Sequence, residues 1–235
     1  MEGYTVERMA EDIYAISEMG HVLVHMYLLI DESKAILIDT GFGGGDLVGT
    51  IRALTDKPLL VIHTHADWDH VGGDKFFPEV YFHKADSGYP DKRLAPPENI
   101  TVKQLRDGEV IAGERFTLEV VHTPGHTMGS VAFVDRKRRL LFSGDSLCDG
   151  VVFMRGEYRD VNLYMQSLEN KFLPLAGQVD VIYPAHDTTP LDPGIIGESI
   201  ETVRKLLARE LVGKTGCIPG RDVICYQYKR PIIAC

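Results

Sequence analysis

The stretch His63-Thr-His-Ala-Asp-Trp-Asp-His-Val-Gly-Gly73, or HTHADWDHVGG, sets three histidines and two aspartates close together in the chain. The first four of these polar side chains alternate, so on an extended strand they would all share one face. Such a strand would be about 20 Å long, too long for its side chains to surround one ion. The chain must therefore turn after His65, and residues 67–70 must lie in a loop or at the start of a helix. Gly72 and Gly73 favour that break, because glycine adopts conformations that other residues resist.

Further histidines and an aspartate follow strand-like runs later in the chain: His122 and His126 in HTPGH, Asp145 in SGDS and His186 in YPAHD. Loops that follow strands gather at one edge of a sheet, where a rigid scaffold can bring distant segments together. Imidazole and carboxylate ligands suit zinc, iron or manganese. For any single histidine a hydrogen-bonded core role is the commoner case, and we keep that interpretation for His21, His25 and His83. The joint arrangement of the others favours a metal site.

Hydrophobic patterning predicts two similar halves, each with strands followed by a helix and another strand. The predicted strands are residues 6–17, 25–31, 34–41, 59–63, 116–123, 130–135, 139–145 and 179–186, and the predicted helices are residues 46–54, 163–172 and 198–211. This alternation fits an α/β sandwich with helices packed outside two central sheets. No linker of distinct composition divides the chain, so we expect a single domain over residues 1–235.

Composition narrows the classes of partner. The net charge of −9 argues against a nucleic-acid partner, and the basic run Arg136–Arg139 lies between two predicted strands, where a solvated turn is expected. No apolar run approaches the ~20 residues of a membrane span, so we expect no membrane partner. An acidic N-terminus without signal-peptide features makes a cytoplasmic location the default. The sequence leaves the oligomeric state open.

The four cysteines form no CxxC pair and show no zinc-ribbon spacing. They are Cys148, Cys217, Cys225 and Cys235. A disulfide among the last three is conceivable, although a reducing compartment would not support it. Sequence alone leaves their redox state open.

Taken together, these motifs resemble the metallo-β-lactamase superfamily of hydrolases, and its glyoxalase-II-like branch most closely. The matching segments are LIDTG at 37–41, HTHADWDHVGG at 63–73, HTPGHTMGS at 122–130, SGDS at 143–146 and YPAH at 183–186, in the order found in the family. The resemblance implies a four-layer αββα sandwich. When the family pattern HxHxDH is aligned on Asp69 and His70, Asp67 stands where the family has its middle histidine.

The resemblance also implies a set of metal ligands. The first site would consist of His65, Asp67 and His126, the second of Asp69, His70 and His186, and Asp145 would bridge the two. Asp39 is expected to support the site from outside, and His122 to support its loop. His63 lies two positions before the pattern, so it could replace the missing histidine only if the strand shifted.

By resemblance, the chain is a metal-dependent hydrolase that directs a metal-bound hydroxide at an ester, thioester or lactone of a small molecule. Asp69 is the predicted catalytic residue, orienting the water or accepting its proton. The implied cofactors are two divalent metal ions, zinc in the first place, with iron or manganese as alternatives because Asp67 adds a carboxylate. This added negative charge should acidify bound water less. Two alternatives remain: only the second site fills, or the chain is a metal- or metabolite-binding protein of the same fold with little hydrolytic activity.

Three other features have two interpretations each. Gly41–Gly45 suggests a dinucleotide-binding loop, but the last glycine of GxGxxG is replaced by Asp46, which favours a flexible loop beside the metal site. Trp68 either lines a substrate pocket or packs beneath its loop. The segment Arg155–Arg159, with Tyr158, either contacts an anionic substrate or is a solvated loop.

Overall fold

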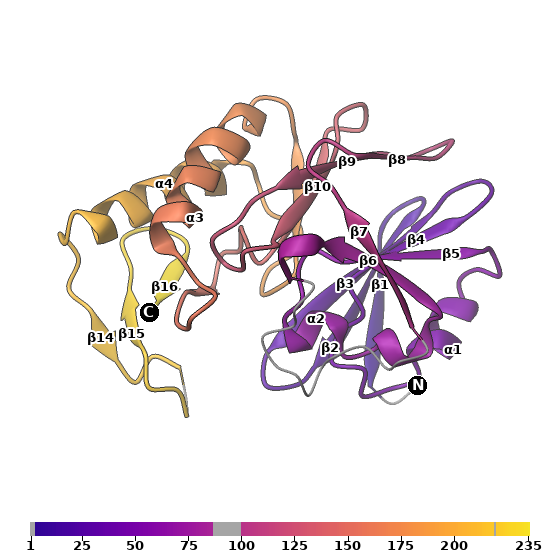
Figure 1. Cartoon of the computed structure of the whole chain (residues 1–235), viewed down its shortest axis with the longest axis horizontal. Coiled ribbons are helices and arrows are strands. Elements are labelled where there is room, and N and C mark those ends of the chain that lie inside the picture. The colour runs from indigo at the N-terminus through magenta and orange to yellow at the C-terminus, as the bar shows by residue number, and fades with distance from the viewer. Residues whose placement is uncertain (1–2, 87–99, 219) are drawn as a thin grey trace. The chain divides into compact units, whose positions relative to one another are not determined.

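The computed structural model describes residues 3–86, 100–218 and 220–235, shown as a ribbon in Figure 1. The chain divides into two compact units, Met1–Val120 and Val121–Cys235. Each unit contains a hydrophobic cluster of its own. The single domain expected over residues 1–235 stays a prediction.

The first unit is built on a seven-stranded sheet with the strand order β1-β2-β3-β4-β5-β6-β7. Its strands are β1 (Tyr4–Ala10), β2 (Ile13–Met19), β3 (Leu23–Ile30), β4 (Ala35–Ile38), β5 (Leu59–Ile62), β6 (Glu79–His83) and β7 (Thr101–Leu105). Neighbours are antiparallel from β1 to β4 and parallel from β4 to β7. The run predicted over residues 6–17 is therefore two strands, which meet at a turn where Arg8 donates to the carbonyl oxygens of Ala10 and Glu11.

Two short α-helices pack on this sheet, α1 (Leu47–Arg52) and α2 (Trp68–Val71), together with the 3-10 turns η1 (Asp74–Phe76) and η2 (Lys84–Asp86). Asp46 caps α1 as predicted, because its carboxylate accepts a hydrogen bond from the amide of Gly49 at 2.8 Å. Side chains of both helices join the sheet in one apolar cluster. Its members include Leu47, Ile51 and Val71 of the helices and Leu28, Leu37 and Val61 of the strands. A hairpin of β8 (Val110–Ala112) and the first part of β9 (Thr117–His122) completes the unit.

In the second unit, β9 is followed in one sheet by β10 (Val131–Asp135), β11 (Leu140–Gly144) and β13 (Val181–Pro184). β10 and β11 are antiparallel and are joined by the basic turn at Arg136–Arg139, as expected, whereas β11 and β13 are parallel. A second sheet in the order β12-β16-β15-β14 was not anticipated. It consists of β12 (Val151–Phe153), β14 (Lys214–Thr215), β15 (Ile224–Tyr226) and β16 (Ile232–Ala234).

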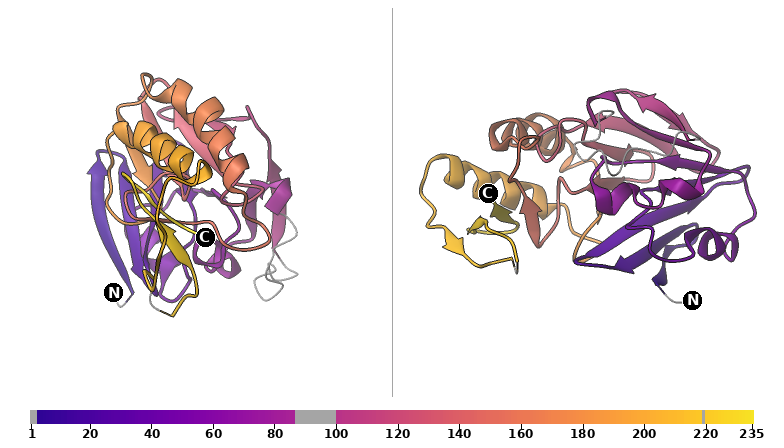
Figure 2. Two further views of the ribbon diagram at one scale, coloured as in Figure 1. Left: turned by 90° about the vertical axis from the view of Figure 1, so that its left-hand side faces the viewer. Right: turned by 60° about the horizontal axis from the view of Figure 1, so that its bottom comes forward.

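The helices of this unit are α3 (Val161–Ser167), its continuation η4 (Leu168–Phe172), the 3-10 turn η5 (Leu173–Leu175) and α4 (Gly194–Leu207). α3 and α4 lie side by side in Figure 1 and in both views of Figure 2. The helix predicted over residues 198–211 is placed too far along the chain. It begins earlier because Asp192 accepts the amide of Gly194, and it ends before Arg209, which adopts a φ of 58°.

A disulfide joins Cys217 to Cys225, with the two Cα atoms 6.1 Å apart. Cys148 is buried as a free thiol, and Cys235 is a half-buried free thiol. The sequence had left this pairing open. Within the described part of the chain, no helix is both long and apolar enough to cross a bilayer.

Candidate metal centre

In the first unit, the site begins where two parallel strands end side by side. β4 pairs with β5, so that the residues that follow them, Asp39 and His63, come to the same edge of the sheet. The amide of Asp39 donates to the carbonyl of Ile62 at 2.9 Å and continues the pairing. Carboxyl ends of parallel strands are a common place for binding sites, because loops from separate segments converge there.

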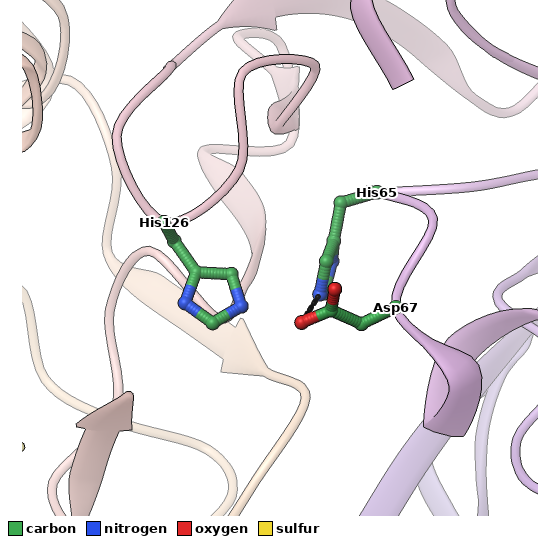
Figure 3. Close-up of side chains that lie close together, drawn as sticks. All are labelled: His65, Asp67 and His126. Carbon is green, nitrogen blue, oxygen red and sulfur yellow. Dashed lines mark ion pairs between the residues drawn. The ribbon is translucent and has the colours of Figure 1, made fainter. Parts of the chain in front are cut away.

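After His65 the chain turns into α2, as the spacing of the motif predicts. Asp67 is the N-cap residue, and Asp69 and His70 lie in the helix. Figure 3 shows His65 and Asp67 with the ion pair between them, which joins His65 Nε2 to Asp67 Oδ2 at 3.4 Å. The imidazole rings of His65 and His70 are 4.0 Å apart between centroids, and His70 Nε2 lies 3.9 Å from Asp69 Oδ1. This turn therefore gathers two imidazoles and two carboxylates.

Asp67 differs from the other aspartates that begin helices. The side chain of Asp46 caps α1, and that of Asp160 accepts the amides of Asn162 and Leu163 in α3. Asp67 makes no such side-chain cap bond, and its carboxylate faces His65 instead. The geometry fits a ligand role better than a capping role.

Asp39 orients the imidazole of His70 from below. Its Oδ2 atom accepts from His70 Nδ1 at 2.9 Å and from the Thr64 hydroxyl at 2.8 Å, and its Oδ1 atom accepts the Thr64 amide at 2.8 Å. Burial opposes the charge of Asp39, but attraction to His70 and His63, with the hydrogen bond from His70, holds the pKa of this carboxyl well below its usual range. The bond to Nδ1 leaves Nε2 of His70 as the nitrogen suited to a metal.

His63 is fully buried at 0% exposure and lies between two carboxylates. Its Nε2 atom is 2.9 Å from Asp74 Oδ1, and its Nδ1 atom is 3.4 Å from Asp39 Oδ1. Burial lowers the pKa of His63, but attraction to the nearby carboxylates of Asp74 and Asp39 outweighs it and raises the pKa to about 9. His63 therefore does not stand in for the histidine that Asp67 replaces. Asp74, not anticipated from the sequence, follows the glycine pair of the motif.

The glycine-rich loop at Gly41–Gly45 is held by Glu18, whose carboxylate accepts the amides of Phe42, Gly43 and Gly44. These are the amides that a dinucleotide phosphate would need, so the loop is not a phosphate cradle. A Cβ atom on Gly43 would lie 2.3 Å from the carbonyl oxygen of Gly72. The loop thus packs against the end of α2, and three of its amides are bonded to Glu18. Glu18, which comes from a distant strand, gave no signal in the sequence.

Trp68 both packs and remains accessible. Its ring lies 4.8 Å from that of Phe42 and 5.8 Å from that of His21, while 37% of the residue is exposed. His25, by contrast, bonds the Ser17 hydroxyl at 2.7 Å on neighbouring strands, in keeping with the structural role expected for it.

In the second unit, Asp145 and His186 follow the parallel strands β11 and β13, and the amide of Ala185 donates to the carbonyl of Gly144 at 3.2 Å. The two oxygens of Asp145 face different histidines. Oδ2 lies 3.3 Å from His126 Nε2, and Oδ1 lies 3.3 Å from His186 Nε2. One carboxylate therefore lies within ion-pair distance of two imidazoles.

The loop that carries His126 is held by β12, by Arg159 and by α3. His126 Nδ1 bonds the carbonyl of Phe153 at 3.0 Å, and Arg159 donates to the carbonyl of His126 at 2.5 Å. A Cβ atom on Gly125 would lie 2.3 Å from the backbone of Tyr164, so α3 sits directly on this loop. His122 Nε2 bonds the carbonyl of Met128 at 2.9 Å, which is the loop-supporting role expected for it.

The loop that carries Asp145 is held by its neighbours on both sides. The Ser143 hydroxyl donates to the carbonyl of Leu147 at 3.0 Å and so supports this loop. The Tyr164 hydroxyl donates to the carbonyl of Ser146 at 2.8 Å. Burial raises the pKa of Tyr164 far above its usual value, so it remains a donor.

Two arginines of the segment Arg155–Arg159 make contacts within the protein. Arg155 lies 3.5 Å from Asp222 in an exposed ion pair, and Arg159 supports the His126 loop. Tyr158 is exposed. The substrate role considered for this segment therefore has its best remaining candidate in Tyr158.

The donor chemistry of both units fits a divalent metal. The first unit offers imidazole and carboxylate groups around α2, and the second offers two imidazoles around Asp145. Hydrogen bonds to the Nδ1 atoms orient His70 and His126. Nitrogen and oxygen donors without a thiolate suit zinc, iron and manganese. Orientation from outside the ligand set is typical of protein metal sites.

A family model described as the metallo-beta-lactamase superfamily matches residues 19–211. An acyl-coenzyme A thioesterase, MBLAC2 of Gallus gallus, is 28% identical over 198 residues, covering 69% of this chain and 72% of the relative. Hydroxyacylglutathione hydrolase GloC of Haemophilus influenzae is 28% identical over 175 residues, covering 65% of this chain and 80% of the relative.

Among solved structures, that of DIM-1 metallo-beta-lactamase exposed to ceftazidime matches with a TM-score of 0.73 at 18% identity, covering 87% of this chain and 98% of that chain. At this identity the likeness concerns the fold alone. It confirms the predicted fold class, an α/β chain with several sheets.

Proposed function

Because this chain belongs to the metallo-β-lactamase superfamily, we propose that it is a metal-dependent hydrolase acting on small-molecule thioesters. Relatives named as an acyl-coenzyme A thioesterase and a hydroxyacylglutathione hydrolase support this substrate class, since both names describe thioester hydrolysis. Esters and lactones, which share the electrophilic carbonyl, are the next classes to test.

The arrangement around Asp145 carries the proposal. Its two oxygens each face the Nε2 atom of a different histidine at 3.3 Å, and both histidines lie in loops after strands. Asp39 also lies between two histidines, but there the Nδ1 atoms of His63 and His70 face it. At Asp145 both histidines present Nε2, and the Nδ1 atom of His126 is already bonded to the Phe153 carbonyl, which supports a carboxylate shared between two metal ions.

We accordingly assign two divalent ions to the ligand set that the motif register implies: His65, Asp67, Asp69, His70, His126, Asp145 and His186. Support comes from the contacts within each unit and from the bonds by which Asp39 and the Phe153 carbonyl fix the Nδ1 atoms of His70 and His126. Zinc is the first candidate, and iron or manganese the alternatives, because Asp67 makes the set richer in oxygen.

When bound, the ions would supply Lewis acidity and acidify a water molecule. The remaining chemistry belongs to the chain. Asp69, in the first turn of α2, would orient the attacking water and accept its proton. Trp68, partly exposed beside that turn, would contact the acyl group of the substrate.

The test is hydrolysis of acyl-coenzyme A and acylglutathione thioesters, with ester, lactone and phosphodiester comparators, after loading with zinc, iron or manganese. We expect thioester turnover that falls by about 10²–10⁴-fold in Asp69→Asn and is abolished in His70→Ala. His25→Asn, which alters a buried histidine on β3, should retain activity. Turnover that survives His70→Ala would exclude this site as its source.

The second candidate, a binding protein with little hydrolytic activity, is favoured by one observation, the carboxylate at Asp67. Elemental analysis of protein purified without chelator separates the two functions at the first step. About two ions per chain support the hydrolase. One ion or none after soaking, together with tight metabolite binding and no turnover, supports the binding protein.

A further inference from the structure

His63 is a buried histidine that the proposed ligand set leaves unused. It follows β5 directly, has no exposed surface, and lies near the ring of Phe82 at 6.4 Å between centroids. Both of its nitrogens face carboxylates, those of Asp39 and Asp74. A histidine so placed cannot turn a nitrogen toward a metal without breaking one of these contacts.

One carboxylate leads from His63 to the ring of His70. Asp39 faces the Nδ1 atom of His63 with its Oδ1 atom. Its Oδ2 atom accepts the Nδ1 proton of His70 at 2.9 Å. Asp39 adopts a φ of 65°, a conformation that is costly for a residue with a side chain and persists only when its surroundings impose it. Its contacts therefore fix both its own backbone and the orientation of the His70 ring.

The other carboxylate leads from His63 to the backbone of His70. Asp74 Oδ1, which lies 2.9 Å from His63 Nε2, accepts the Thr40 hydroxyl at 2.8 Å. Thr40 in turn contacts the carbonyl of His70 twice, from its hydroxyl at 3.0 Å and from its amide at 2.7 Å. The ring and the main chain of His70 are thus held by two arms.

We propose that His63 is a positioning residue for His70, closing the two arms from Asp39 and Asp74 into one network that fixes this ligand. The proposal rests on the proposed function in one respect only, the assignment of His70 as a metal ligand. His63 acts through Asp39 and touches neither metal nor substrate.

The first test reads the orientation of His70 without metal. In the ¹⁵N-labelled metal-free chain, the imidazole resonances of His70 are assigned with a His70→Gln variant. His63→Gln should shift or broaden the Nδ1 resonance of His70, because Asp39 loses one of its supports. His25→Gln, a matched change of a buried histidine in the same unit, should leave it in place. An unchanged His70 resonance in a folded His63→Gln protein overturns the proposal.

The second test measures metal affinity by competition with a chromophoric chelator, and the ligand field from the visible spectrum of the cobalt-loaded protein. His63→Gln should weaken binding by about 10–100-fold, the usual effect of losing an orienting partner, and alter the cobalt spectrum. A variant that merely lost stability would keep the wild-type spectrum in its folded fraction. Unchanged affinity and spectrum overturn the proposal.

Asp74→Asn is a second variant that tests the proposal. It keeps the contact between His63 and Asp39 and weakens the contact between His63 and residue 74. If His63→Gln does not fold, Asp74→Asn should give the same changes at smaller size, and their absence overturns the proposal. Failure of the proposed function is distinguishable. A wild-type chain that binds no metal refutes that function, and the resonance of His70 in the metal-free chain then decides the role of His63.

Discussion

Asp67 is the residue at which this chain departs from its family pattern, and its surroundings show what the change does locally. As the N-cap residue of α2 it could bond helix amides, yet its carboxylate lies 3.4 Å from His65 Nε2 instead. In the proposed ligand set, this further carboxylate would make a pair of dications less positive and favour harder metals.

Replacing Asp67 with histidine should therefore shift the metal content toward zinc. Because the cluster becomes more positive, the acidic limb of the kcat/KM profile should move to lower pH. Elemental analysis and pH–rate profiles measure both effects, and turnover should change by about tenfold or more. Unchanged metal content and turnover would show that Asp67 has no special importance.

Asp31 is a buried aspartate that is not among the proposed metal ligands. It is fully buried and accepts the amides of Glu32 at 2.7 Å and Arg115 at 2.9 Å. Burial opposes its charge, but the hydrogen bonds from Arg115, Glu32 and Phe116 outweigh it and lower the pKa of Asp31. A carboxyl whose pKa is lower in the folded than in the unfolded state stabilises the fold above its unfolded pKa. That contribution is lost as the pH falls through the folded pKa.

Asp31→Asn should accordingly lower the free energy of unfolding at pH 7 by about 1.5–3 kcal/mol, the range for hydrogen bonds to a charged group. The difference from wild type should shrink as the pH falls below about 4, where the wild-type carboxyl loses its own contribution. Urea denaturation of both proteins at pH 7 and below pH 4 measures this difference in the free energy of unfolding. Asp56→Asn, at an exposed aspartate, is the control. A difference that stays constant with pH would contradict the assignment.

The glycine loop at Gly41–Gly45 packs against the C-terminal end of α2 through backbone atoms. Gly43 has a φ of 69°, and a Cβ atom there would lie 2.3 Å from the carbonyl oxygen of Gly72. The amide of Gly72 donates to the carbonyl of Gly41 at 2.9 Å. A side chain at position 43 would therefore push α2, and with it Asp69 and His70, away from the loop.

A comparison of Gly43→Ala with Gly108→Ala distinguishes the cost of this close contact from the cost of a left-handed backbone alone. Gly108 also has a positive φ, 77°, but a Cβ atom there would meet nothing within 4 Å. Gly108→Ala should cost about 1–2 kcal/mol for the left-handed backbone alone. Gly43→Ala should cost about 1–3 kcal/mol more and lower metal affinity. Chemical denaturation and chelator competition measure the two effects, and equal costs would argue against the close approach.

For the whole molecule, bound metal should stabilise the chain because it binds the folded state only. At a free concentration of about 100 Kd the gain is about 2.7 kcal/mol, or roughly 5–10 °C in the unfolding midpoint for a chain of this size. Chelator treatment should remove the gain, and added metal should restore it. His70→Ala should show a smaller response, whereas midpoints independent of metal would contradict the ligand assignment.

The sequence predicted most elements because their signals are local. Alternating and continuous apolar runs marked β3, β5, β10 and β11, and Asp46 marked the start of α1. The limits of α4 were missed because they depend on Asp192 and on the left-handed Arg209. The strands of the C-terminal sheet were missed because they are only two or three residues long, too short for a periodic pattern.

What the sequence by itself determined is the family and the turn after His65, because motif spacing constrains how the chain can run. It also supplied the residues proposed here as metal ligands. Only the tertiary structure decided how those side chains are held. Glu18 bonding the glycine loop, Asp74 facing His63, and Tyr164 holding the Asp145 loop join positions far apart in the sequence. Such contacts follow from the packing of strands and helices, and no local pattern of residues encodes them.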